Sequence, residues 1–135
     1  FQNIHGGGQS VPMEYDNATA PYYSETVRTW DTAQDWTVAG VDTLVLYVKG
    51  IAGNDATQPL YVALENQGRT PAVVTLDPAV LTATDWTEQE IPLSRFAGLD
   101  ARTVRKMYIG VGNRATPTQG GAGKFYIDDI RLTRP

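Results

Sequence analysis

The sequence has 135 residues, no cysteine and one histidine, His5. The lack of cysteine excludes disulfides, thiolate metal ligands and a cysteine nucleophile. One histidine is too few for a multi-histidine metal centre, and a serine triad would have to depend on His5 alone. No Gly-x-Ser-x-Gly motif is present either. The sequence therefore gives little support to catalysis, and we expect a protein that is not an enzyme.

Positive charge and long apolar runs are also scarce. The chain has 11 lysines and arginines against 15 aspartates and glutamates, a net charge of −4. Nucleic acids and anionic membranes attract clustered cations, so neither is an expected partner. There is no run of about eighteen apolar residues and no recognisable signal peptide, so we expect no membrane insertion.

What the sequence does contain is short alternating stretches separated by turn residues. Hydrophobic residues make up 41% of the chain, with 13 glycines and 8 prolines, and no long helical pattern occurs. The length predicts a single domain over residues 1–135. The predicted strands are 11–15, 24–30, 43–49, 60–66, 72–76, 85–93, 106–112 and 124–132. About eight strands of this kind predict an all-β fold, an antiparallel β-sandwich or jelly roll.

The last predicted strand, 124–132, contains a break in its alternation. The two apolar residues before Asp128 and the two after Asp129 have opposite parity, although alternate residues of a regular strand share a face. One extra residue, as in a β-bulge, returns both pairs to the same face. A bulge also re-aims side chains, so Asp128 and Asp129 are the strongest candidates for a functional site.

Several stretches together resemble a known family. They are residues 8–17, Trp36 followed by 44–50, Trp86 followed by 91–93, residues 108–112 and residues 125–132. The sequence resembles the galactose-binding-domain-like jelly rolls and, more narrowly, the non-catalytic carbohydrate-binding modules of large secreted bacterial proteins. The resemblance covers nearly the whole chain. It implies a secreted or extracellular module that targets a larger parent protein, with other domains, to polysaccharide or glycan.

The resemblance also implies a structural calcium ion beside the last strand. In such domains an aspartate of the final strand is a calcium ligand, which indicates Asp128 first and Asp129 second. Family members usually begin with an additional strand whose Phe-Glu pair helps to hold the metal, and this sequence starts after that point. Either Glu14 substitutes for that carboxylate, or backbone carbonyls hold the metal, or the site is incomplete.

Sugars stack their C–H faces on aromatic rings and direct their hydroxyls to planar polar groups. Tyr22 and Tyr23 lie in a predicted loop. Tyr47 and Tyr61 lie on the outward parity of strands 43–49 and 60–66, which we expect to pair as antiparallel neighbours with the two rings side by side. Trp30, Trp36 and Trp86 are better interpreted as core residues. The predicted carbohydrate-binding residues are Tyr22, Tyr23, Tyr47, Tyr61, Arg28, Arg69 and Arg114.

Two other functions compete with this interpretation. The domain is alternatively a structural or adhesion domain that contacts a protein partner, or a neighbouring copy, through an exposed sheet edge. A glycan-active enzyme would need a carboxylate pair such as Glu88 and Glu90. These lie two apart on one strand, about 7 Å from each other, between the retaining and inverting separations. We interpret them as solvated.

Overall fold

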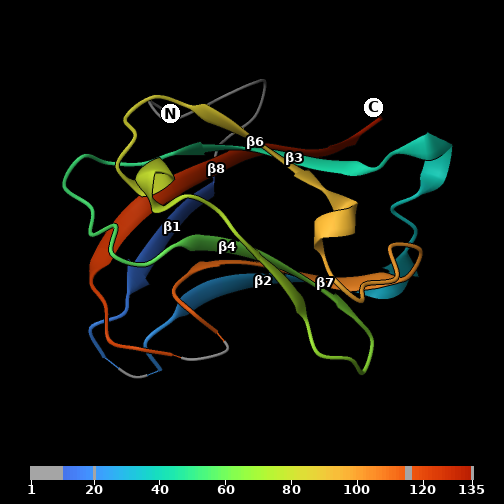
Figure 1. Ribbon diagram of the computed structural model, residues 1–135, viewed down its shortest axis with the longest axis horizontal. Helices are drawn as coiled ribbons and strands as arrows, with labels where there is room; N and C mark the ends of the chain where they lie inside the picture. Colours follow the sequence, from blue (N-terminus) through green and yellow to red (C-terminus); the bar gives the residue numbers. More distant parts are fainter. Residues whose placement is uncertain (1–10, 20, 115–116, 135) are drawn as a thin grey trace.

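The computed structural model describes residues 11–19, 21–114 and 117–134; His5 lies outside them. Their eight strands form two four-stranded antiparallel sheets, which confirms the predicted β-sandwich. Sheet A has the order β1 (Val11–Asp16), β8 (Ala122–Thr133), β3 (Thr43–Lys49), β6 (Thr87–Pro92). Sheet B has the order β2 (Ser24–Gln34), β7 (Val104–Val111), β4 (Leu60–Asn66), β5 (Ala72–Thr75). In Figure 1, β8, β3 and β6 form the upper layer, and β4, β2 and β7 the lower.

All eight predicted strands are present, and β3 and β4 have the predicted boundaries. β2 runs beyond the predicted end at residue 30, to Gln34. Three 3₁₀ helices, Val38–Gly40, Pro78–Leu81 and Leu93–Arg95, lie in the described connections. No helix in residues 11–19, 21–114 and 117–134 is long and apolar enough to cross a membrane.

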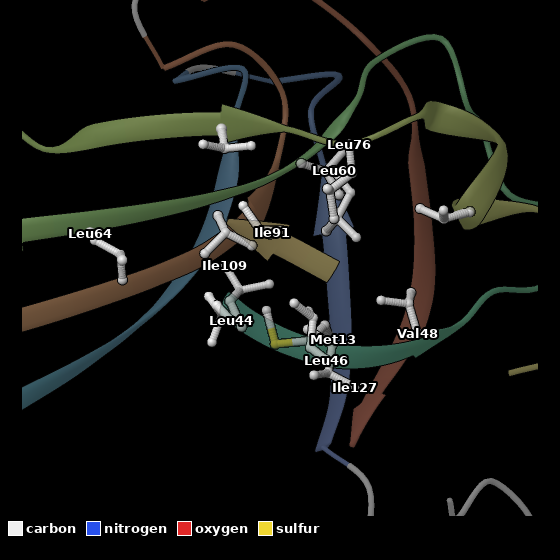
Figure 2. Packing of buried hydrophobic residues seen from close by; sticks show 14 of the residues in the cluster. Met13, Leu44, Leu46, Val48, Leu60, Leu64, Leu76, Ile91, Ile109 and Ile127 are labelled. Carbon is white, nitrogen blue, oxygen red and sulfur yellow. The ribbon is translucent and has the colours of Figure 1, made fainter. Parts of the chain in front are cut away.

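The core lies between the sheets and is built from alternate residues of the strands. Figure 2 shows side chains of both layers, such as Leu44 and Ile109, pointing into this space. Trp36 belongs to the core, as predicted, with 8% of its surface exposed. The half-buried ring of Trp30 meets it edge-on at 5.9 Å.

The expected pairing of the strands 43–49 and 60–66 is wrong. β3 pairs with β6 and β8, whereas β4 pairs with β5 and β7, so the two strands lie in different sheets. In each of the two strands, the apolar residues of one parity belong to the core between the sheets. Two strands can both bury their core-facing residues whether they are hydrogen-bonded neighbours in one sheet or face each other across the core. Alternation therefore does not show whether β3 and β4 share a sheet. Residues 50–59 carry the chain from one sheet to the other.

The predicted bulge in the last strand is confirmed. Tyr47 lies opposite Asp128, but Val45 lies opposite Arg131, so one residue of β3 between them faces two residues of β8. Asp129 takes up the extra length with a φ of 55°. The apolar residues on the two sides of the bulge thereby point to the same side of the sheet.

Candidate functional site

The outer face of sheet B carries two tyrosines that are buried although they point away from the main core. Tyr61 of β4 is 0% exposed and Tyr108 of β7 is 8% exposed. Together with Ala63 they form a hydrophobic cluster separate from the core. A sheet face that lies on the outside normally exposes its side chains, so other groups must cover these rings. We call Tyr23, Glu25, Tyr61, Glu65, Tyr108 and Arg114 the outer-face cluster.

Tyr61 reaches across a whole strand because of a glycine. Its hydroxyl donates a hydrogen bond to Glu25 of β2, although β7 lies between β4 and β2. Gly110 of β7 is opposite both residues. A Cβ atom at Gly110 would lie 2.7 Å from the Tyr61 hydroxyl oxygen. The missing side chain therefore leaves the space that the Tyr61 ring uses.

Arg114 covers this part of the face. Its Nε lies 2.6 Å from Oε1 of Glu25, and its Nη2 lies 3.3 Å from Oε2. The guanidinium carbon lies 4.6 Å from the ring centre of Tyr108 and 5.8 Å from that of Tyr23. A guanidinium over an aromatic face is attracted by the ring quadrupole. Arg114 thus joins the loop after β7 to three side chains of the cluster.

The second carboxylate of the cluster has a matching set of partners. The Tyr108 hydroxyl donates to Oε1 of Glu65 at 2.9 Å, and Nζ of Lys106 lies 3.8 Å from Oε2 of Glu65. Each carboxylate is therefore bonded to one tyrosine and paired with one cation. The two negative and two positive charges balance, so this part of the face is polar but neutral.

Both phenols are held in their protonated form. Burial, followed by the hydrogen bond to Glu65, raises the pKa of Tyr108 to about 12. Burial also raises the pKa of Tyr61, and the hydrogen bond to Glu25 adds to this effect. At neutral pH both hydroxyls are therefore donors, and the carboxylates accept their hydrogen bonds.

The structure brings three of the predicted carbohydrate-binding residues together, since Tyr23, Tyr61 and Arg114 all belong to the outer-face cluster. Tyr47 does not join them. It lies on the outer face of sheet A, where its hydroxyl donates to Glu88 and Arg131 lies 5.7 Å from its ring centre. The expected side-by-side placement of Tyr47 and Tyr61 is wrong for the reason given above, that β3 and β4 are in different sheets.

The other three predicted residues also lie apart from the cluster's hydrogen bonds. Tyr22 is half-buried in the turn before β2 and has a φ of 69°. Arg28 lies on β2 on the parity that faces the other sheet, with its guanidinium 5.4 Å from the Trp30 ring centre. Arg69 lies in the β4–β5 connection, at one end of the sandwich.

Sequence reasoning missed Glu25, Glu65 and Tyr108. Tyr108 could have been predicted from its position in the strand. Its neighbours Met107 and Ile109 point inward, so its aromatic ring must point outward, as that of Tyr61 does. The two glutamates carried no such signal, because acidic residues on the outward parity of a strand are ordinary surface residues.

Glu88 and Glu90 lie on β6 at the edge of sheet A and are exposed, as their interpretation as solvated residues required. A hydrogen bond with Glu88 raises the pKa of Glu90.

Two of the three predicted metal ligands, Asp128 and Asp129, lie at the bulge. Asp128 Oδ1 accepts a hydrogen bond from the Asp129 N–H at 2.7 Å, and Asp129 Oδ2 lies 2.7 Å from Arg131 Nη1. Glu14 lies elsewhere, since it is opposite Lys124, four residues before Asp128. That spacing corresponds to about 13 Å along the strand.

Calcium takes six to eight oxygen ligands. Within the described ranges, no group of three or more histidine, cysteine, aspartate or glutamate side chains is placed to hold a metal ion. The bulge itself supplies the carboxylates of Asp128 and Asp129 and its backbone carbonyls. The calcium site therefore stays a prediction.

No protein-family model and no curated protein matches the chain. Several solved structures share its fold. A family 30 carbohydrate-binding module aligns with a TM-score of 0.72 at 14% identity, covering 100% of this chain and 81% of that one. A family 30 module of a cellulosomal cellulase of Clostridium thermocellum aligns with 0.67 at 14% identity, covering 98% and 79%.

A family 11 carbohydrate-binding module from Clostridium thermocellum, in complex with a beta-1,3-1,4-mixed-linked tetrasaccharide, aligns with a TM-score of 0.59. The identity is 16%, with 95% of this chain and 85% of that one covered. The chain thus has the β-sandwich fold of carbohydrate-binding modules, which confirms at the level of the fold the resemblance indicated by the sequence.

Proposed function

We propose that the chain is a non-catalytic carbohydrate-binding module that binds a polysaccharide or glycan on the outer face of sheet B. The observation that carries the proposal is the outer-face cluster, in which Glu25, Glu65 and Arg114 are held in place by tyrosines. Sugar hydroxyls bind to planar polar groups of this kind. Because hydrogen bonds already fix these side chains, binding costs little of their conformational entropy.

The face also offers apolar contacts for the C–H surface of a sugar. One row of the sheet runs from Val27 through Tyr108 and Ala63 to Val73. Val27 is 51% exposed and Val73 is 42% exposed, so the two ends of this row are accessible. Tyr23 is half-buried and offers the remaining aromatic surface of the cluster. Tyr61 and Tyr108 act by positioning the carboxylates, because their own rings are covered.

The wider role follows from the likeness to carbohydrate-binding modules. In this proposal the chain is secreted or extracellular and brings a larger parent protein with other domains to its polysaccharide. The similarity to a module of a cellulosomal cellulase supports this role. The same likeness supports a protein that binds glycan without cleaving it.

Native gels containing soluble polysaccharides test this proposal. The unmodified protein should be retarded by at least one member of a panel of β-glucan, xylan, mannan and galactan. Arg114→Ala should weaken binding about tenfold or more, because it removes a central charged group that holds Glu25 and covers Tyr108.

Arg131→Ala is the matched control, because Arg131 also lies over a tyrosine and pairs with an aspartate, but on sheet A. It should bind like the unmodified protein. No retardation of the unmodified protein across the panel contradicts the proposal. If light scattering then showed concentration-dependent assembly, the adhesion domain would be favoured instead.

The structural calcium ion is a separate part of the proposal. If calcium binds the folded state through Asp128 and Asp129, chelation should lower the melting temperature by mass action. At a calcium concentration a hundred times Kd the stabilisation is about 2.7 kcal/mol. Asp128→Ala should melt like the chelated protein, whereas the exposed Asp85→Ala should still respond to chelation. An unchanged melting curve after exhaustive chelation argues against the ion.

A further inference from the structure

A polar groove lies at the end of the sandwich where the β4–β5 connection meets the β6–β7 connection. It has a volume of about 440 Å³. The two connections lie at the same end of the molecule in Figure 1. Side chains of both connections and of the adjoining strands line the groove: Ala33, Asn66, Gln67, Arg69, Asp100, Thr103 and Arg105. A second groove of about 380 Å³ adjoins it, and Arg69 lines both.

Neither arginine of this groove, Arg69 or Arg105, forms an ion pair with a carboxylate of the described residues, although Arg69 acts electrostatically on Asp100. Arg105 Nη1 donates to Oε1 of Gln67 at 3.3 Å, and Gln67 is a neutral amide. The guanidinium of Arg69 forms neither an ion pair nor a hydrogen bond with the described part of the chain. Arg114 and Arg131, by contrast, each pair with a carboxylate. The groove therefore presents two guanidinium groups without an ion pair in the described part of the chain, while its carboxylate, Asp100, is ion-paired with Arg102.

The groove also contains hydrogen-bond acceptors. Asp100 is one of them, and its carboxylate pairs with Arg102 at 3.1 Å. Hydrogen bonds from Arg102 lower the pKa of Asp100, and the positive charge of Arg69 adds to the effect, so Asp100 is ionised at neutral pH. The Gln67 amide and the Thr103 hydroxyl are neutral acceptors. A ligand that fits must offer hydrogen-bond donors as well as negative charge.

The groove is held in shape by an asparagine that is not itself available to a ligand. Asn66 is 7% exposed. Its Nδ2 donates to the carbonyl oxygens of Asp100 and Thr103, both at 2.8 Å, and its Oδ1 accepts from the Asp100 N–H at 2.9 Å. These bonds fasten the β6–β7 connection to the end of β4. The groove is therefore a preformed feature of the fold.

We propose that this groove binds an acidic sugar, with Arg69 and Arg105 on the uronate carboxylate and with Asp100 and Gln67 on neighbouring hydroxyls. The planar fork of arginine matches a carboxylate. A simple inorganic anion gains nothing from the acceptors and is repelled by Asp100, and an acidic peptide does not present a row of hydroxyls. The site is distinct from the outer-face cluster and does not depend on it.

Calorimetric titration of the whole chain with trigalacturonate and with trimannuronate tests the proposal. At least one should bind, and methyl esterification of its carboxylates should abolish binding because it removes the charge without removing the hydroxyls. Arg69→Gln and Arg105→Gln should each weaken binding by about three- to tenfold, a modest effect because both side chains are in contact with water. The double variant should not bind.

Arg134→Gln is the matched control, because it removes one exposed arginine that does not line the groove. It should bind like the unmodified protein. Binding should also weaken as salt concentration rises. The proposal is overturned if neither acidic trisaccharide binds, if the methyl ester binds equally well, or if sodium sulfate or a hexa-aspartate peptide binds as tightly. The gel assay tests glycan binding on the outer face of sheet B, and the calorimetric titration tests the groove. A negative result in the gel assay therefore does not contradict the proposal for the groove.

Discussion

Gly110→Ala should abolish glycan binding on the outer face and lower the free energy of unfolding by about 3 kcal/mol. The added Cβ would lie 2.4 Å from the carbonyl oxygen of Ser24 and 2.7 Å from both the Cβ of Glu25 and the Tyr61 hydroxyl. Since the Ser24 oxygen belongs to the backbone, β2 would have to move away from β7. Tyr61 would also lose the space through which it reaches Glu25.

Chemical denaturation and affinity gels run well below the unfolding transition check this result. Gly53→Ala is the matched control, because no atom lies within 4 Å of the Cβ it would add. We expect it to change stability by less than about 0.5 kcal/mol. If Gly110→Ala unfolded at the same denaturant concentration as the unmodified protein and bound the same glycan, our account of the outer face would be wrong.

Asn66→Ala should destabilise the protein by a similar amount, about 3 kcal/mol. The substitution removes the partners of the Asp100 carbonyl, the Asp100 N–H and the Thr103 carbonyl together. A buried polar group without a partner costs about 1–3 kcal/mol. Water from the adjoining groove offsets part of this loss, so the three costs should not sum fully.

The next residue supplies the control for this prediction. Gln67 is exposed, and its side chain contacts Arg105 at 3.3 Å. Gln67→Ala should therefore shift the denaturation midpoint very little. Equal midpoints for Asn66→Ala and Gln67→Ala would show that the asparagine does not fasten the β6–β7 connection to the sheet.

The local features of the fold could be predicted from the sequence. The boundaries of β3 and β4 could be predicted because each is a short apolar run with one parity in the core, and a glycine-containing turn follows each run. The bulge at Asp129 could also be predicted. When the apolar residues of one strand change parity, an extra residue must lie between them in the same strand. The position of the bulge can therefore be predicted from the residues next to it in the sequence.

The sequence also led to part of the outer-face cluster. Tyr61 is a predicted sugar-binding residue because its aromatic ring lies on the outward parity of the strand 60–66. Its partner Glu25 was not predicted, because the two residues are 36 positions apart and meet only when β7 lies between their strands. Arg114 and Glu25 are 89 positions apart. No local pattern encodes a contact of that kind.

By itself, then, the sequence determined the all-β class, the strands, the inward faces of β3 and β4, and the bulge at Asp128 and Asp129. Those features depend on the spacing of apolar residues along the chain. The tertiary structure decided which strands share a sheet, and hence that Tyr47 and Tyr61 lie on opposite outer faces. It also decided that Arg69 and Arg105 line one groove. Burial of apolar side chains is non-directional, so it drives the two sheets together without specifying which strands lie side by side.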